Sequence, residues 1–190
     1  MQTRFILVVS SLLLLPVAGT GIFARLSAAS QTPRAPYVDE LSSPIRGLST
    51  REVDDLLNGR GAGFARMAEL NDYPGPRHVL DLKEQLNLSA KQTQQVQAAF
   101  EKMNVEAKRL GREIVAQEQR LSIAFANKTI APAKLQTQTE ALATLYSKLR
   151  QTHLQAHLEI TPILSPKKIA TYNVLRGYTD GKTPIRHHGN

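Results

Sequence analysis

The sequence contains no cysteine and no tryptophan in 190 residues, and only 5% of its residues are aromatic. Without cysteine, the chain has neither a disulfide framework nor a thiolate metal site. It also lacks a nucleophile elbow, a His-Glu-x-x-His motif and a spaced pair of carboxylates on a rigid scaffold. We therefore expect a binding protein and not an enzyme, with no cofactor required for catalysis.

A long apolar run is also missing beyond residue 29, whereas spanning a bilayer needs about 20 apolar residues. The N-terminus differs: Arg4 precedes an apolar stretch over residues 5–19, and small residues follow at 27–29. This pattern is typical of a signal peptide over residues 1–29, cut after Ala29. The alternative is an uncleaved anchor over residues 5–24. Both interpretations predict export to the periplasm.

Positive charge dominates, with a formal net charge of +8 and a sequence pI near 9.9. Removing residues 1–29 takes away Arg4 and Arg25 and no acid, so +8 becomes +6. In a cytosolic protein this charge would favour nucleic-acid binding. For an exported chain we expect no nucleic-acid partner. A basic face would meet anionic lipid, acidic envelope polymers or negatively charged client proteins instead.

Residues 30–75 are rich in proline and glycine, and we expect a flexible leader containing one short helix. Ser49 and Glu52 form a capping-box sequence at the start of that helix. The glycine-rich segment 59–63 is not a phosphate-binding loop, because it follows a helix stop and lacks the Lys-Ser/Thr ending. The segment 73–76, Tyr-Pro-Gly-Pro, is a firm break before the next helix.

Two motifs of the form Leu-Ser-x-x-polar divide the rest of the chain. Their defining residues are Leu88, Ser89 and Gln92 in the first motif, and Leu164, Ser165 and Lys168 in the second. Each serine is positioned to be a helix N-cap, and each preceding leucine can pack on the helix that follows. Pro166 strengthens the second helix start because proline suits the first helical position.

Between the motifs, the apolar residues follow the alternating spacing of four and three that is typical of a heptad seam. The first helix carries Val96, Phe100, Met103, Ala107, Leu110, Ile114 and Leu121, and the return helix over 133–163 carries Leu135, Leu142, Leu145, Leu149 and Ala156. Gly111 is a tolerated weak point in this pattern. Two such helices joined by a short turn predict an antiparallel hairpin.

The domain predicted over residues 76–178 is therefore all-α: a long helical hairpin with two shorter helices, 78–87 and 166–178, packed at its base. Leu154 and Leu158 form a second apolar stripe on the return helix, which we expect to contact those helices. A hairpin this thin also predicts a homodimer. Residues 179–190 are expected to be a disordered tail.

This arrangement resembles the LTxxQ group of Spy- and CpxP-like periplasmic proteins, with Lys168 standing where the group has glutamine. The resemblance covers about residues 76–178. It implies one of three roles: an ATP-independent chaperone that holds clients in a basic, partly apolar dimeric cradle, an inhibitor of envelope stress sensing, or a metal-responsive sensor of the CnrX and ZraP kind. The last two imply a partner such as a sensor kinase or an anti-sigma system.

Three histidines bear on the metal alternative. His153 and His157 are four residues apart on one helix face, and His78 lies in the predicted first base helix. With Asp81 or Glu84, they make a ligand set that suits Zn, Ni, Co or Cu. However, Leu82 stands where CnrX-like sensors have a second base-helix histidine. The competing interpretation is that these histidines only make hydrogen bonds between helices.

Our main hypothesis is a holdase or stress-adaptor protein that binds partly unfolded envelope proteins. Five basic residues of the long helix are its candidate client-binding residues: Lys102, Lys108, Arg109, Arg112 and Arg120. Acidic residues alternate with them, so a merely solvated helix face is the competing interpretation. The alternative hypothesis is a heavy-metal sensor or metal-binding protein that uses His78, His153 and His157. A purely structural envelope protein is a third possibility.

Overall fold

The computed structural model describes residues 34–43 and 45–179, and every regular element in that part of the chain is helical, apart from one isolated bridge between Ile45 and Leu48. The prediction of an all-α fold is confirmed. In chain order the elements are η1 (Val38–Ser42), α1 (Thr50–Leu57), α2 (Arg66–Glu69), α3 (Pro76–Asp81), α4 (Ala90–Ala126), α5 (Pro132–Ile160), η2 (Thr161–Ile163) and α6 (Pro166–Leu175).

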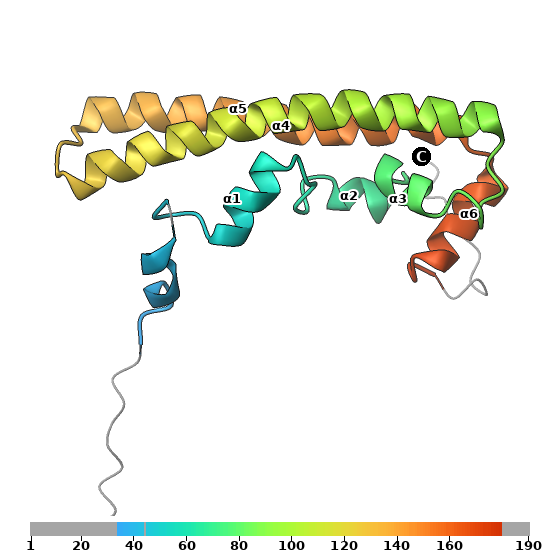
Figure 1. The fold of residues 1–190 in the computed structure, drawn as a ribbon, viewed down its shortest axis with the longest axis horizontal. Helices are drawn as coiled ribbons and strands as arrows, with labels where there is room; N and C mark the ends of the chain where they lie inside the picture. Colours follow the sequence, from blue (N-terminus) through green and yellow to red (C-terminus); the bar gives the residue numbers. More distant parts are fainter. Residues whose placement is uncertain (1–33, 44, 180–190) are drawn as a thin grey trace, which may run out of the picture. The chain divides into compact units, whose positions relative to one another are not determined.

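Helices α4 and α5 form the predicted antiparallel hairpin and lie side by side (Figure 1). Their facing seams meet in one apolar cluster near the middle of the hairpin. The buried members of this cluster are Leu48, Leu56, Ala107, Leu110, Ile114, Leu142 and Leu149. The heptad spacing therefore identified most of the residues that join the two helices.

A second apolar cluster holds the base of the hairpin, where α3 and α6 pack. It contains Val79, Leu86, Val96, Ala99, Ile160, Leu164 and Tyr172, all buried. Tyr172 of α6 and Val79 of α3 are fully inaccessible to solvent. Both shorter helices are thus anchored at the base, as predicted, although α3 ends at Asp81, earlier than expected, and turns continue to Asn87.

The two Leu-Ser motifs bond to each other across this base. Ser89 and Ser165 cap α4 and α6 as predicted, accepting from the amides of Gln92 and Lys168. The Gln92 side chain also donates to the carbonyl of Ile163, at 2.7 Å, directly before the second motif. In return, the Lys168 Nζ donates to the carbonyl of Leu86, at 2.7 Å, and to that of Asn87, the two residues before the first motif.

The segment over residues 45–75 differs from the flexible leader that we expected. α1 has its predicted capping box at Ser49 and Glu52, but the segment packs along the hairpin and buries Ile45, Leu48 and Leu56. These apolar residues cover the hairpin seam, so this segment is packed on the hairpin despite its proline- and glycine-rich composition.

Gly111 of α4 lies directly against the backbone of α1. A β-carbon at this position would lie 1.9 Å from the carbonyl oxygen of Leu56, at the C-terminal end of α1. Glycine is therefore required here by a backbone contact. The sequence alone had suggested only a tolerated weak point.

The second apolar stripe predicted on the return helix is also wrong. Leu158 is 54% exposed, and the residues of α5 that are buried toward the base segments are His153, His157 and Ile160. A polar pair thus occupies a helix face where we expected leucines.

Within the described ranges, no helix combines the length and the apolar character needed to cross a membrane. The predicted signal peptide or anchor over residues 1–29 and the tail from residue 180 onward lie outside the described residues.

We predict that Gly111→Ala destabilises the protein, although alanine normally stabilises a helix interior by about 1 kcal/mol relative to glycine. The added methyl group must displace α1 from α4, which typically costs about 1–3 kcal/mol. The measurement is the free energy of unfolding from urea denaturation followed by circular dichroism. Ser147→Ala on the exposed face of α5 is the matched control and should be neutral or slightly stabilising.

Candidate functional site

The three predicted histidines line one cavity at the base of the hairpin. This cavity, of about 270 Å³, is enclosed by α3, α4, α5 and the glycine-rich loop 59–61. Its polar lining comprises Asn58, Arg60, Glu69, Arg77, His78, Asn104, His153 and His157. A neighbouring hollow shares Glu69 and all three histidines and extends to Tyr178. We call this region the histidine pocket.

His153 is the most deeply buried histidine of the pocket. Only 3% of its surface is exposed, and the Phe64 ring stacks nearly parallel to it, with 6.1 Å between ring centroids. Its Nε2 atom is buried and has no hydrogen-bond partner among the described residues. Burial, together with the neighbouring His157, lowers the pKa of His153 to about 4. This ring is therefore neutral at pH 7, and a buried nitrogen is left unsatisfied.

His157 lies one turn further along α5 and has a fixed orientation. Its Nδ1 is 2.8 Å from the carbonyl oxygen of Tyr73. Because a carbonyl can only accept, Nδ1 must carry the proton, and Nε2 of the neutral ring is left as an acceptor. A histidine that donates through Nδ1 in this way has Nε2 free for a metal ion.

Glu69, at the end of α2, is the acidic group of the pocket. Its Oε1 is 2.9 Å from Nδ1 of His78, and its Oε2 accepts from the hydroxyl groups of Tyr172, at 2.7 Å, and Tyr178, at 3.1 Å. Burial alone would raise the pKa of Glu69, but these hydrogen bonds and the nearby His78 outweigh it and lower the pKa to about 2. The carboxylate is therefore ionised throughout the neutral range.

Gly75 allows these groups to come together. A β-carbon at this position would lie 2.5 Å from Glu69 Oε1, 3.1 Å from His157 Cε1 and 3.4 Å from His157 Nε2. The space that a side chain would fill is therefore shared by the carboxylate and the imidazole. Any residue larger than glycine would separate them or displace the backbone.

Three of the five predicted metal ligands lie in the pocket, and two lie outside it. His78, His153 and His157 share the pocket, whereas Asp81 is exposed and pairs with Arg77, and Glu84 is exposed beside Lys83. Glu69 takes the position that we assigned to Asp81 or Glu84. It lies nine residues before His78, across the Pro-Gly-Pro break, so no helical spacing could have indicated it.

The chemistry of these donors suits a transition metal: imidazole nitrogens with one carboxylate, and a buried nitrogen that lacks a partner. However, within the described ranges no three His, Cys, Asp or Glu side chains lie close enough together to hold a metal ion. The donor types therefore fit a metal, whereas the arrangement is open and not a preformed site.

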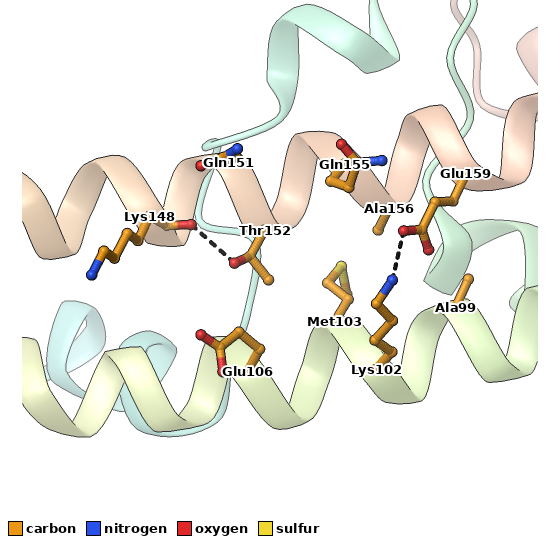
Figure 2. A pocket seen from close by; sticks show the side chains of 10 residues that line it. All are labelled: Ala99, Lys102, Met103, Glu106, Lys148, Gln151, Thr152, Gln155, Ala156 and Glu159. Carbon is orange, nitrogen blue, oxygen red and sulfur yellow. Dashed lines mark hydrogen bonds and ion pairs between the residues drawn. The ribbon is translucent and has the colours of Figure 1, made fainter.

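A separate groove of about 290 Å³ lies between α4 and α5 (Figure 2). Its floor is formed by Ala99, Met103 and Ala156, and its rim is polar and charged. Across one end, Lys102 of α4 pairs with Glu159 of α5 at 2.8 Å. Met103 also lines the histidine pocket, so this side chain lies between the two cavities.

The five predicted client-binding residues do not form one basic surface. Lys102 lines the groove, Arg109 is paired with Glu106 and Glu113, and Lys108 packs beside Gly59 on the face that faces α1. The remaining two, Arg112 and Arg120, are exposed. Only Lys102 therefore contributes to the groove, and Lys148 of α5 is a groove cation that sequence reasoning missed.

We predict that acid destabilises the protein through the pocket. The unfolded state binds a proton at His153 near the ordinary pKa of 6.5, whereas the folded state binds it only near 4. The contribution of His153 to the free energy of unfolding is therefore fully present above pH 6.5. It decreases by about 3 kcal/mol as the pH falls to 4. Glu69, lowered from 4.5 to about 2, adds a further loss between those two values.

Urea unfolding at pH 7, 5.5, 4 and 3 measures this effect, the lowest pH reporting on Glu69. His153→Phe should abolish the loss between pH 6.5 and 4 and keep the loss at lower pH. A control chain with His187 and His188 replaced by alanine should behave as the wild type does. An unchanged pH dependence in His153→Phe would contradict the assignment to His153.

A family model described as heavy-metal resistance matches residues 57–170, which is more than half of the chain and includes α2–α5 completely, the first half of α6, both Leu-Ser motifs and all three pocket histidines. Neither the curated proteins nor the solved structures contained a match. The resemblance to the Spy- and CpxP-like LTxxQ proteins is confirmed by the family match: this chain belongs to the heavy-metal resistance family.

Proposed function

We propose that this protein is an exported, non-enzymatic metal-binding protein that serves metal resistance by binding a divalent transition metal in the histidine pocket. The observation that carries the proposal is the unpartnered Nε2 of His153, in a cavity that also holds His157, His78 and Glu69. A buried polar atom without a partner costs about 1–3 kcal/mol. Binding a metal would remove that cost.

The hydrogen bonds around the pocket support the same proposal. His157 and His78 each engage Nδ1 with an oxygen, of the Tyr73 carbonyl and of Glu69, respectively. The first bond leaves Nε2 of His157 available as a ligand, the arrangement in which outer groups orient metal-binding imidazoles. The second bond orients Glu69, the carboxylate of the pocket. Neutral nitrogen donors with one carboxylate favour Zn, Ni, Co or Cu over Mg or Ca.

The open arrangement favours a sensor or buffer over a permanently loaded site. Because no three donors are already gathered, metal binding must draw side chains together and is linked to a change in the pocket. Such a change could be read by a sensor kinase or an anti-sigma system in the envelope. A periplasmic location is part of this proposal.

We predict that the purified chain lacking residues 1–29 binds Zn²⁺, Co²⁺, Ni²⁺ or Cu²⁺ with a Kd below about 10 μM, and that His153→Phe weakens this binding at least tenfold. Phenylalanine keeps the ring packed on Phe64 but removes the nitrogen. The measurement is calorimetric titration at pH 7, because protons compete for histidine nitrogens at lower pH.

All titrations are done in a chain with His187 and His188 replaced by alanine, so that the tail histidines cannot bind the metal. The matched control is Asp81→Asn, which alters the acid of α3 outside the pocket and should leave the affinity unchanged. Binding that is absent in the wild type, or equal in His153→Phe, would refute a metal site at this pocket.

The α4–α5 groove supports a second candidate function, an ATP-independent chaperone. Its apolar floor of Ala99, Met103 and Ala156 could contact unfolded segments, and Lys102 and Lys148 could attract acidic ones. No histidine lines the groove, so the two functions use different polar side chains and can coexist, with Met103 common to both cavities.

We predict that the protein then suppresses aggregation of an acidic, disulfide-reduced client without ATP, and that raising salt weakens this effect. Lys102→Glu with Lys148→Glu should reduce suppression several-fold. Lys128→Glu with Lys134→Glu, near the hairpin turn, changes the net charge equally and should have little effect. Light scattering measures the outcome, and equal suppression by both double variants would exclude the groove.

A further inference from the structure

Glu69 connects the histidine pocket to α6. Its Oε1 faces the pocket, 2.9 Å from Nδ1 of His78 and close to the position shared with His157 at Gly75. Its Oε2 faces away and accepts two hydrogen bonds, from Tyr172 and Tyr178. One carboxylate thus has one oxygen toward the pocket and the other toward two tyrosines of the C-terminal helix and the turn after it.

The C-terminal part of α6 depends on this short segment for its polar anchors. Tyr172 is fully buried, and its hydroxyl also accepts from the amide of Gly75 at 3.4 Å. Asn173 donates to Asp72 at 2.6 Å, and the Tyr178 ring packs on Tyr172 with 6.5 Å between centroids. The hydrogen bonds all reach residues 69–75, from the end of α2 to the start of α3. α6 contributes no histidine, and the Tyr178 ring, in the turn after α6, lines the pocket.

We propose that Glu69 is the carboxylate ligand of the histidine pocket and that Tyr172 and Tyr178 are its positioning residues, so that a divalent transition metal in the pocket tightens the attachment of the C-terminal end of α6. This inference rests on the proposed function. It adds a residue set and a route out of the pocket that neither the family match nor the histidine spacing assigns.

The count of hydrogen bonds determines the sign of this coupling. An ionised carboxylate offers about four lone-pair positions. Three are used in the structure, two on Oε2 and one on Oε1, so the remaining position belongs to Oε1, on the pocket side. A metal can therefore be accepted without displacing either tyrosine. The tyrosines then act as outer groups that hold a ligand in place, whose loss typically costs 10–100-fold in metal affinity, that is about 1.4–2.7 kcal/mol.

Because of thermodynamic linkage, the proposal can be tested by the metal affinity of the pocket and by the attachment of α6. If the Tyr178 hydrogen bond raises metal affinity by some factor, the metal must strengthen that hydrogen bond by the same factor. The attachment of α6 should therefore become tighter when the pocket is filled, although α6 supplies no ligand. A purely structural role for Tyr178 would produce neither effect.

The decisive variant is Tyr178→Phe, which removes one hydroxyl at a position that is 38% exposed and so should leave the fold intact. We expect it to weaken Co²⁺ and Zn²⁺ binding roughly tenfold while the urea midpoint of the metal-free protein changes little. Glu69→Gln should weaken binding more and shift the d–d absorption of the Co²⁺ form, because it replaces a ligand. Tyr146→Phe is the matched control, since its hydroxyl also donates to a glutamate, Glu118, outside the pocket.

Hydrogen exchange gives the second measurement. Zn²⁺ should slow amide exchange over residues 173–178 in the wild type and not in Glu69→Gln. Wild-type metal binding with unchanged affinity in Tyr178→Phe, or with no slowing of exchange in α6, would overturn this inference and leave the proposed function standing. Failure of the wild type to bind any of the metals would overturn both.

Discussion

The reciprocal hydrogen bonds between the two Leu-Ser motifs are the constraint on which the base of this structure depends. Gln92, at the start of α4, bonds the carbonyl before α6, and Lys168, at the start of α6, bonds the carbonyls before α4. Each bond gives a partner to backbone oxygens at a chain reversal, where regular helical hydrogen bonding stops. Together they hold the starts of two helices at one end of the hairpin. Glutamine and lysine are equivalent in this role, because both present a long side chain with a donor at its end.

This base in turn positions the histidine pocket. Because α6 starts at a defined point against α4, Tyr172 extends into the base cluster with its hydroxyl beside Glu69 and Gly75. The pocket contains groups that are unusual in a protein interior. They are a neutral imidazole with an unpartnered nitrogen, an ionised carboxylate, and a glycine whose missing side chain leaves space between them. Such local violations are expected at functional sites, where stability is given up for binding. The rest of the core, which is apolar and regular, compensates for that loss.

The elements that the sequence predicted well are those governed by local physics. Serine caps, heptad spacing and the proline starts depend on neighbouring residues, so α1, α4, α5 and α6 begin within a residue or two of their predicted positions. The errors arose where a distant contact outweighed the local signal. Residues 45–75 have a loop-like composition but pack on the hairpin through Ile45, Leu48 and Leu56. On α5, His153 and His157 are buried and Leu158 is exposed, because the segments around Tyr73 and Phe64 supply a carbonyl and a ring that suit imidazole.

The sequence by itself determined an all-α hairpin, the positions of its caps and the shared helix face of His153 and His157, because all of these follow from periods of three and four residues along one chain. Only the tertiary structure decided which acid joins the histidines, why Gly111 and Gly75 must be glycine, and that Tyr172 and Tyr178 bond the pocket carboxylate. Each of these depends on the distance between residues that are far apart in sequence, such as Glu69 and Tyr172 or Leu56 and Gly111. Such distances are set by how helices pack, and no local pattern records them.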